Sequence, residues 1–63
     1  MPIVTIDGPE INKEKKRNLV QQVTQIVAKI YELPENAITT VIKENPPENI
    51  GVGGSLLADR HSK

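Results

Sequence analysis

The chain contains no cysteine, no phenylalanine and no tryptophan, and its 63 residues include one histidine and one tyrosine. Without cysteine, neither a disulfide nor a thiolate metal site can form. The histidine, His61, lies in a polar tail. We therefore also expect no histidine-cluster metal centre and no Ser-His-Asp catalytic set. Because aromatic residues are so few, the core must be built from Ile, Val and Leu.

A charge excess of one sign and long apolar runs are missing as well. Eight basic and eight acidic residues give a net charge of zero, which argues against a nucleic-acid-binding protein such as a small strand–helix transcription factor. No apolar run approaches the roughly 20 residues of a membrane span. The start of the chain also lacks the charged and apolar regions of a signal peptide. These absences predict one soluble, cytoplasmic domain over residues 1–63, without a cofactor.

The residues that are present alternate between strand and helix patterns. Ile3–Ile6 is apolar and β-branched and predicts a strand, and the turn residues Asp7-Gly8-Pro9 are expected to end it. Asn12 is suited to cap a helix, and apolar residues at helical spacing continue that helix to about Glu32. Pro34 closes it, and the β-branched run Ile38–Lys43 predicts a second strand. Strand, helix and strand in this order predict a right-handed βαβ unit with parallel strands.

The last third of the chain is rich in turn residues. Asn45-Pro46-Pro47 ends the second strand, and Gly51-Val52-Gly53-Gly54 predicts a tight hairpin or a turn where backbones pack closely. This glycine pattern follows no strand and precedes no GK[ST], so it is no phosphate-binding loop. Ser55–Ala58 is compatible with a short strand or a turn of helix. The predicted fold class is therefore α+β, a βαβ unit followed by a C-terminal hairpin.

A protein of this design cannot bury much apolar surface by itself. A chain of this size buries only about 60% of its unfolded surface. A two-stranded sheet with one helix leaves one face and both edges open. We therefore expect an obligate homo-oligomer in which sheets pair edge to edge and bare faces pack together.

Pro2 directly follows Met1 and is the candidate catalytic residue. Within a chain, a proline nitrogen is an amide whose lone pair is delocalised. If Met1 is removed, which a small second residue permits, the same nitrogen becomes a secondary amine that can take up a proton. Pro2 is thus a candidate general base only in the form without Met1.

Basic residues are the candidate ligands for an acidic substrate. Four of them crowd the first turns of the predicted helix: Lys13, Lys15, Lys16 and Arg17. A solvated helix start is the simpler interpretation, although cations reinforce the attraction of a helix N-terminus for anions. Lys16 lies in the apolar stripe, where its stem can also simply cap the core edge. Lys43 ends the second strand, at the edge where α/β folds often place ligands, but an edge lysine also discourages aggregation.

Taken together, these features resemble the 4-oxalocrotonate tautomerase family over nearly the full length. The resembling parts are Met1-Pro2, the βαβ unit from Ile3 to Ile42 and the late turn Gly51-Val52-Gly53-Gly54. The segment from Glu44 to Gly54 is especially similar to a microbial tautomerase subgroup. The resemblance implies a cofactor-independent keto–enol isomerase that assembles as a homohexamer, a trimer of dimers. It also implies that the Pro2 amine is the general base, acting on a small 2-hydroxy or 2-oxo acid such as 2-hydroxymuconate.

The chain departs from the best-known members of this family where they bind substrate. Ile11 and Thr39 stand where those members have arginines, and Ile50 stands where they have phenylalanine. Ile50 is expected to keep the role of an apolar wall. Pro2 and the turn glycines match the family directly; the glycines are Gly51, Gly53 and Gly54.

The missing arginines lead to two further expectations. We expect their role to pass to Lys43, Lys16 or Arg17, and less directly to Arg60, with a neighbouring protomer as a possible source. They also leave two alternatives open. One is a dehalogenase or decarboxylase, with a protonated proline as acid and a carboxylate, Glu10 or Glu44, activating water. The other is a non-catalytic oligomeric binding protein.

Overall fold

The computed structural model describes residues 1–60 and confirms an α+β fold built on a βαβ unit. That unit consists of β1 (Ile3–Gly8), α1 (Lys13–Tyr31) and β2 (Thr39–Glu44), and a 3-10 helix, η1 (Glu35–Ala37), precedes β2. A second group of short elements follows: η2 (Pro47–Asn49), β3 (Gly51–Val52), β4 (Ser55–Leu56) and α2 (Leu57–Arg60). His61 lies outside the described residues.

The first sheet is parallel, as the strand–helix–strand order predicts. Ile3 lies opposite Thr39, and the register continues to Gly8 opposite Glu44. Two further hydrogen bonds extend the ladder: the Thr39 N–H donates to the Pro2 carbonyl (3.1 Å) and the Asn45 N–H to the Gly8 carbonyl (2.8 Å). β1 is therefore two residues longer than Ile3–Ile6, because sheet pairing draws Asp7 and Gly8 out of the expected turn.

Helix α1 has specific capping interactions at both ends. The Asn12 side chain accepts a hydrogen bond from the Lys15 N–H at 2.8 Å, so the predicted N-cap is confirmed. At the other end Glu32 adopts a left-handed conformation (φ 59°), and the Leu33 N–H donates to the Ala28 carbonyl, as in a Schellman motif. None of the helices within residues 1–60 is long and apolar enough to cross a membrane.

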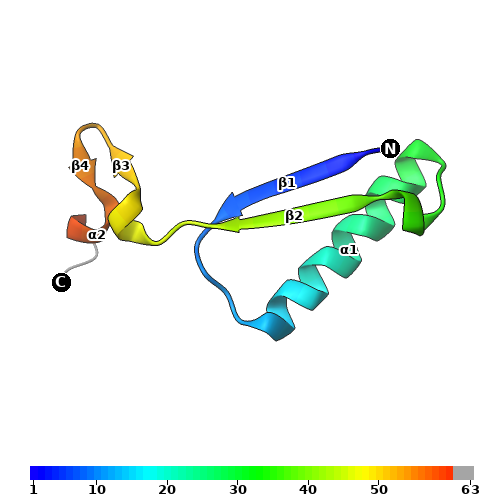
Figure 1. Cartoon of the computed structure of the whole chain (residues 1–63), viewed down its shortest axis with the longest axis horizontal. Helices are drawn as coiled ribbons and strands as arrows, with labels where there is room; N and C mark the ends of the chain where they lie inside the picture. Colours follow the sequence, from blue (N-terminus) through cyan, green and yellow to red (C-terminus); the bar gives the residue numbers. More distant parts are fainter. Residues whose placement is uncertain (61–63) are drawn as a thin grey trace.

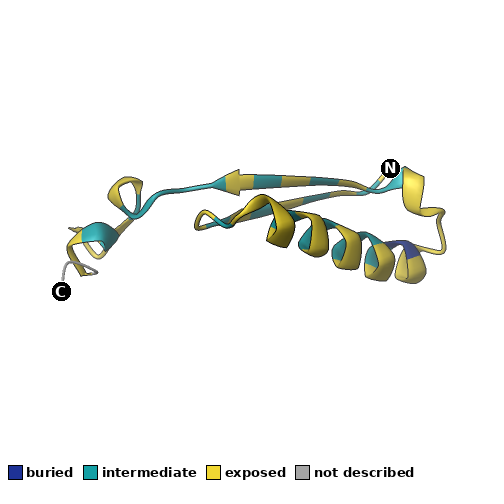
Figure 2. Cartoon of the chain, turned by 90° about the horizontal axis from the view of Figure 1, so that it is seen from below, coloured by how far each residue is buried: buried dark blue, intermediate teal, exposed yellow. Residues whose placement is uncertain are grey.

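One face of the β1–β2 sheet is covered and the other is bare. Figure 2 shows α1 along one face, where alternate strand residues such as Val4 and Ile42 are half-buried. On the opposite face Ile3 is 61% exposed and Val41 is 38% exposed. Among the residues described, Ala28 alone is a buried hydrophobic. The expectation that the unit leaves one sheet face open is confirmed.

The C-terminal elements form an arm beyond the carboxyl ends of β1 and β2 (Figure 1). β3 and β4 pair antiparallel through a two-residue loop, Gly53-Gly54. Both glycines have positive φ (60° and 89°), as the tight hairpins of twisted strands require. The Leu57 N–H donates to the Ile50 carbonyl (2.8 Å), so α2 folds back on the start of the arm. The predicted hairpin is confirmed, and Ser55–Ala58 is part strand and part helix.

Thr40 gives a direct test of the packing between sheet and helix. Its hydroxyl is buried, and no hydrogen-bond partner for it lies within residues 1–60. An unsatisfied buried polar group costs about 1–3 kcal/mol, so we expect Thr40→Val to raise the free energy of unfolding by about 1 kcal/mol. Urea denaturation at fixed protein concentration measures this change. Thr39→Val, at the exposed neighbouring position, should stay within about 0.5 kcal/mol of the parent. Equal gains from both variants would contradict the argument.

Candidate active site

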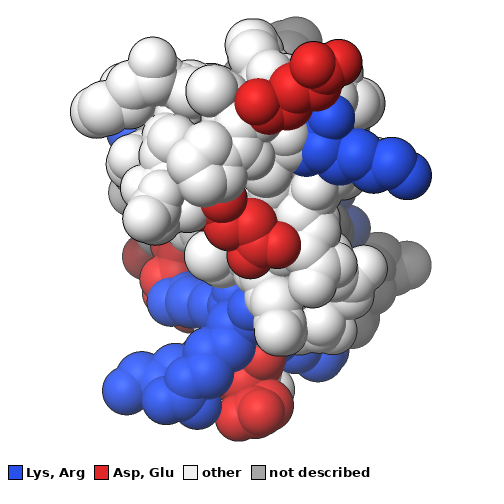
Figure 3. Space-filling view, turned by 90° about the vertical axis from the view of Figure 1, so that its right-hand side faces the viewer, with Lys and Arg blue, Asp and Glu red and all other residues white. Residues whose placement is uncertain are grey.

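Pro2 lies at the amino end of β1, next to the start of β2. It is half-buried, and its carbonyl accepts the hydrogen bond from Thr39 described above. Met1 is 88% exposed, so the peptide bond that must be cut to free the proline nitrogen is accessible. Figure 3 views the molecule from this end, where much of the surface is uncharged. Lys and Arg gather at its lower side, where Figure 1 places the start of α1.

The candidate cations Lys43 and Lys16 lie at the opposite end of the sheet. Lys43 is paired with Asp7, five residues along β1 from Pro2. At about 3.3 Å per residue, this separation is about 16 Å. Lys16 contacts Glu44, which is paired with Gly8, one residue further on. Within one chain, therefore, Pro2 and these lysines do not form a common site.

Lys16 is held in an ion pair. Its ammonium lies 2.8 Å from Glu44 Oε2, and the same oxygen accepts a hydrogen bond from the Ile11 N–H (3.3 Å). The Lys16 hydrogen bond, followed by that of Ile11, lowers the pKa of the Glu44 carboxyl below its ordinary value. The cluster ties the end of β2 to the loop and the first turn of α1. The interpretation of Lys16 as a cap on the core edge agrees with this contact.

The other two candidates, Arg17 and Arg60, are engaged in contacts of their own. Arg17 is 66% exposed and pairs with Glu14 one turn earlier on α1 (3.2 Å). Arg60 donates to the Val52 carbonyl within the arm (3.5 Å). Lys43 is exposed, and no ion pair engages it in the part of the chain that is described. Of the four candidate cations, Lys43 is thus the one that a ligand can recruit without breaking a contact.

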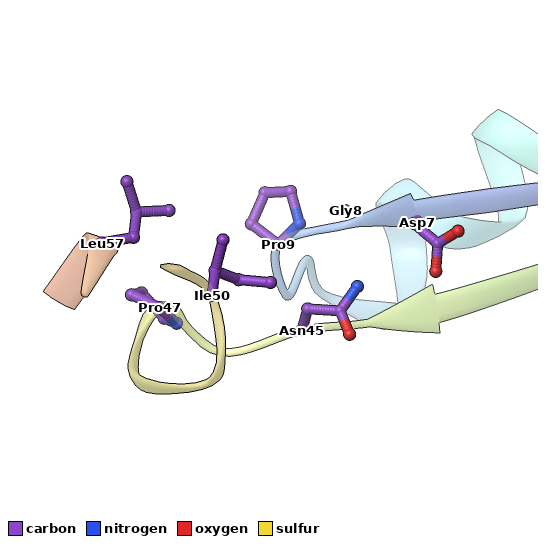
Figure 4. Close-up of a pocket in the computed structure, with 7 residues that line it drawn as sticks. All are labelled: Asp7, Gly8, Pro9, Asn45, Pro47, Ile50 and Leu57. Atoms are coloured by element: carbon purple, nitrogen blue, oxygen red, sulfur yellow. The ribbon is translucent and has the colours of Figure 1, made fainter. Parts of the chain in front are cut away.

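Ile50 lines a pocket where the arm meets the carboxyl ends of the strands (Figure 4). The pocket has a volume of about 350 Å³, within the range of small-molecule sites. Its walls are mainly apolar, and its lining residues are Asp7, Gly8, Pro9, Asn45, Pro47, Ile50 and Leu57. The glycines of the hairpin turn are not in the lining but set the fold of the arm that carries Ile50.

Sequence reasoning missed most of this lining. Asp7, Pro9 and Asn45 read as turn and strand-break residues, and Leu57 as part of an undefined segment. One signal was available for Asp7, since the predicted parallel pairing places it opposite Lys43. Residues 1–60 contain no group of three or more His, Asp or Glu arranged to hold a metal ion.

The sequence is similar to those of proteins described as tautomerases or probable tautomerases. The family profile described as "Tautomerase enzyme" matches residues 2–60. A probable tautomerase of Listeria monocytogenes is 37% identical over 60 residues, which cover 94% of this chain and 98% of the relative. A probable tautomerase of Halalkalibacterium halodurans is 36% identical over 61 residues, covering 95% and 100%.

Solved structures agree with these sequence matches. The crystal structure of DmpI from Archaeoglobus fulgidus superposes with a TM-score of 0.84 at 45% identity, covering 92% of this chain and 100% of that one. YwhB, described as a homologue of 4-oxalocrotonate tautomerase, gives a TM-score of 0.84 at 36% identity, with 92% and 97% covered. Both the βαβ unit and the arm therefore have counterparts in proteins of this kind.

The Glu44 cluster predicts a pH dependence of stability. Because the folded-state pKa of Glu44 is lowered, its stabilising effect is complete above the ordinary value of 4.5 and is lost as the pH falls through the lowered pKa. Glu44→Gln should therefore lower the urea midpoint at pH 7, and this deficit should shrink at pH 3. The exposed Glu48→Gln is the control and should show neither effect. A Glu44→Gln deficit of equal size at both pH values would contradict the assignment.

Proposed function

The chain belongs to the tautomerase family, and on this premise we propose that it is a keto–enol isomerase that uses the Pro2 amine as general base. One observation carries this proposal: the region that matches the family begins at Pro2, and the residue before it, Met1, is exposed and accessible to removal. The substrate is a small unsaturated 2-hydroxy or 2-oxo acid. No cofactor is needed, because the reaction only relocates a proton and a double bond.

In the proposed reaction, the proline amine both removes the proton and returns it, so no second acid or base is required. The neutral amine takes the proton of the enol hydroxyl, and the resulting ammonium returns it to a carbon of the conjugated system, which leaves the keto isomer. An unperturbed α-amino group titrates near 8, so about a tenth of it is neutral at pH 7 and about half at pH 8. Apolar surroundings and nearby cations favour the neutral form further, and cations also stabilise the enolate charge of the transition state.

A second copy of the chain must complete this site. Pro2 and the Ile50 pocket lie at opposite ends of the βαβ unit, so one chain cannot bring them together. The unit also exposes large apolar side chains on its bare sheet face and on α1, where Ile30 is 73% exposed. We therefore infer a homo-oligomer in which Pro2 of one copy meets the apolar pocket of another. The family resemblance favours a hexamer, a trimer of dimers.

The alternatives in which a carboxylate activates water are less well supported. A dehalogenase or decarboxylase of the kind considered above needs a carboxylate that activates water. Glu44 is held by Lys16 and by the Ile11 N–H, and its lowered pKa makes it a weaker base. Glu10 is exposed and is absent from the pocket lining. The tautomerase proposal requires neither residue to act on substrate.

Replacing Pro2 tests the proposed base. General-base catalysis contributes about 10²–10⁴-fold, so protein made while methionine aminopeptidase is inhibited, whose proline nitrogen is an amide, should lose about that factor in kcat/KM on 2-hydroxymuconate or phenylenolpyruvate. Pro2→Ala keeps a primary α-amine once Met1 is removed, so it should also be impaired, but less. Intact mass spectrometry establishes which form is present. Full activity in either protein would refute the role of Pro2, and no turnover of any enol acid by the Met1-free protein would favour a binding protein.

Assembly is tested separately by sedimentation velocity. The parent should sediment as a species several times larger than the 6.9 kDa chain. Val41→Glu places a charge on the bare sheet face, whose burial against another copy is costly, so it should shift the protein to smaller species. Gln21→Glu adds the same charge at an exposed position on α1 and should leave the assembly unchanged. A monomeric parent would overturn the shared site.

A further inference from the structure

We propose that Asp7 selects the substrate of this site, so that it accepts enol acids with one carboxylate and an apolar end and disfavours dicarboxylates. This inference rests on the proposed function and narrows its substrate class. It starts from the pocket beside Ile50 rather than from Pro2.

Among residues 1–60, one ionisable side chain lines the pocket. Asp7 is the charged member of its lining; the remaining members are apolar side chains, a glycine and the neutral amide of Asn45. Figure 4 shows Asp7 and Asn45 at the strand end of the pocket, with Pro9, Pro47, Ile50 and Leu57 toward the arm. None of the lysines and arginines that the structure describes belongs to the lining. The pocket thus offers apolar contact and one negative charge, a poor environment for a carboxylate.

The cation for a substrate carboxylate lies just outside this lining. Lys43 is directly opposite Asp7 in the parallel register, and both side chains are exposed on the bare face of the sheet. No ion pair joins them within residues 1–60. A ligand whose carboxylate contacts Lys43 therefore extends its other end past Asp7 toward Ile50 and Leu57. An apolar end gains contact there, whereas a second carboxylate meets the like charge of Asp7.

The apolar lining of the pocket increases the electrostatic repulsion between Asp7 and a second substrate carboxylate. The repulsion between two carboxylates varies inversely with the effective dielectric constant, which falls when protein replaces water. Packing of a second copy against this face, as proposed above, would exclude water from Asp7 and Lys43 together. Discrimination by about tenfold or more is the expected scale for one like-charge contact at such a site.

The first test compares two substrates in two variants. The parent should show a higher kcat/KM for phenylenolpyruvate, a monocarboxylate with an apolar end, than for the dicarboxylate 2-hydroxymuconate. Asp7→Asn keeps the size of the side chain and removes its charge, and it should raise the ratio in favour of the dicarboxylate by about tenfold. Glu10→Gln removes a nearby exposed charge outside the pocket and should leave the ratio unchanged. Equal shifts in both variants, or none in Asp7→Asn, would overturn the inference.

The second test needs no turnover and so separates this inference from the proposed function. Dissociation constants of adipate and 3-phenylpropionate, two unreactive acids, are measured by NMR titration of the parent and Asp7→Asn. The parent should prefer 3-phenylpropionate, and Asp7→Asn should reduce that preference by about tenfold. If Pro2→Ala proves fully active but this shift is seen, the charge selection stands and the catalytic proposal fails. A preference of the parent for adipate, or one that Asp7→Asn leaves unchanged, would refute the selection by Asp7.

Discussion

The rest of the structure depends on one constraint: two strands and one helix cannot enclose a hydrophobic core. Ala28 alone is a buried hydrophobic among the described residues, although Ile, Val and Leu are distributed along every main element. The apolar stripe of α1 is wider than the sheet it covers, which leaves Ile26 and Ile30 exposed. The arm adds little burial, since it extends away from the βαβ unit. A chain built in this way would bury its apolar surface at contacts with other copies, as proposed above, and a site made there would combine residues that lie far apart in one chain.

The second organising interaction is the cluster of Lys16, Glu44 and the Ile11 N–H. It joins the end of β2 to the loop that precedes α1, and so fixes the end of the sheet where the pocket opens. It also engages Lys16, one of the cations expected from the sequence to bind substrate. With Arg17 paired along α1, Lys43 is left as the available positive charge beside Asp7. The positive charge available to a ligand at this site is thus that of Lys43, because Lys16 is held in an ion pair with Glu44.

The sequence predicted the elements well because their signals are local. The spacing of apolar residues on α1, the Asn12 cap and the β-branched strands depend on neighbours a few positions away, and so did the glycine hairpin. The predicted β1 ended two residues too early. Asp7 and Gly8 are typical turn residues, but pairing with β2 overrides this preference. The site was harder to predict than the fold, because residue types identify candidate groups but not the end of the sheet at which each group lies. Parallel register would have placed Lys43 beside Asp7 and away from Pro2, whereas the ion pair of Lys16 depends on tertiary packing.

The polarity of the βαβ unit explains why a second copy matters for chemistry as well as for stability. A crossover helix runs opposite to the strands it connects, so the C-terminal end of α1 lies at the same end of the unit as Pro2 (Figure 1). That end of a helix carries partial negative charge and stabilises a nearby ammonium, the form of the proline that cannot act as a base. The positive end of α1 and the basic residues around it lie at the far end, beside the pocket. In the proposed oligomer, pairing the Pro2 end of one copy with the pocket end of another would place the amine against apolar walls and near Lys43, both of which favour the neutral form. The Asp7 carboxylate opposite Lys43 acts the other way and favours the ammonium. The same contact that buries the bare sheet face would thus also set the protonation of the base.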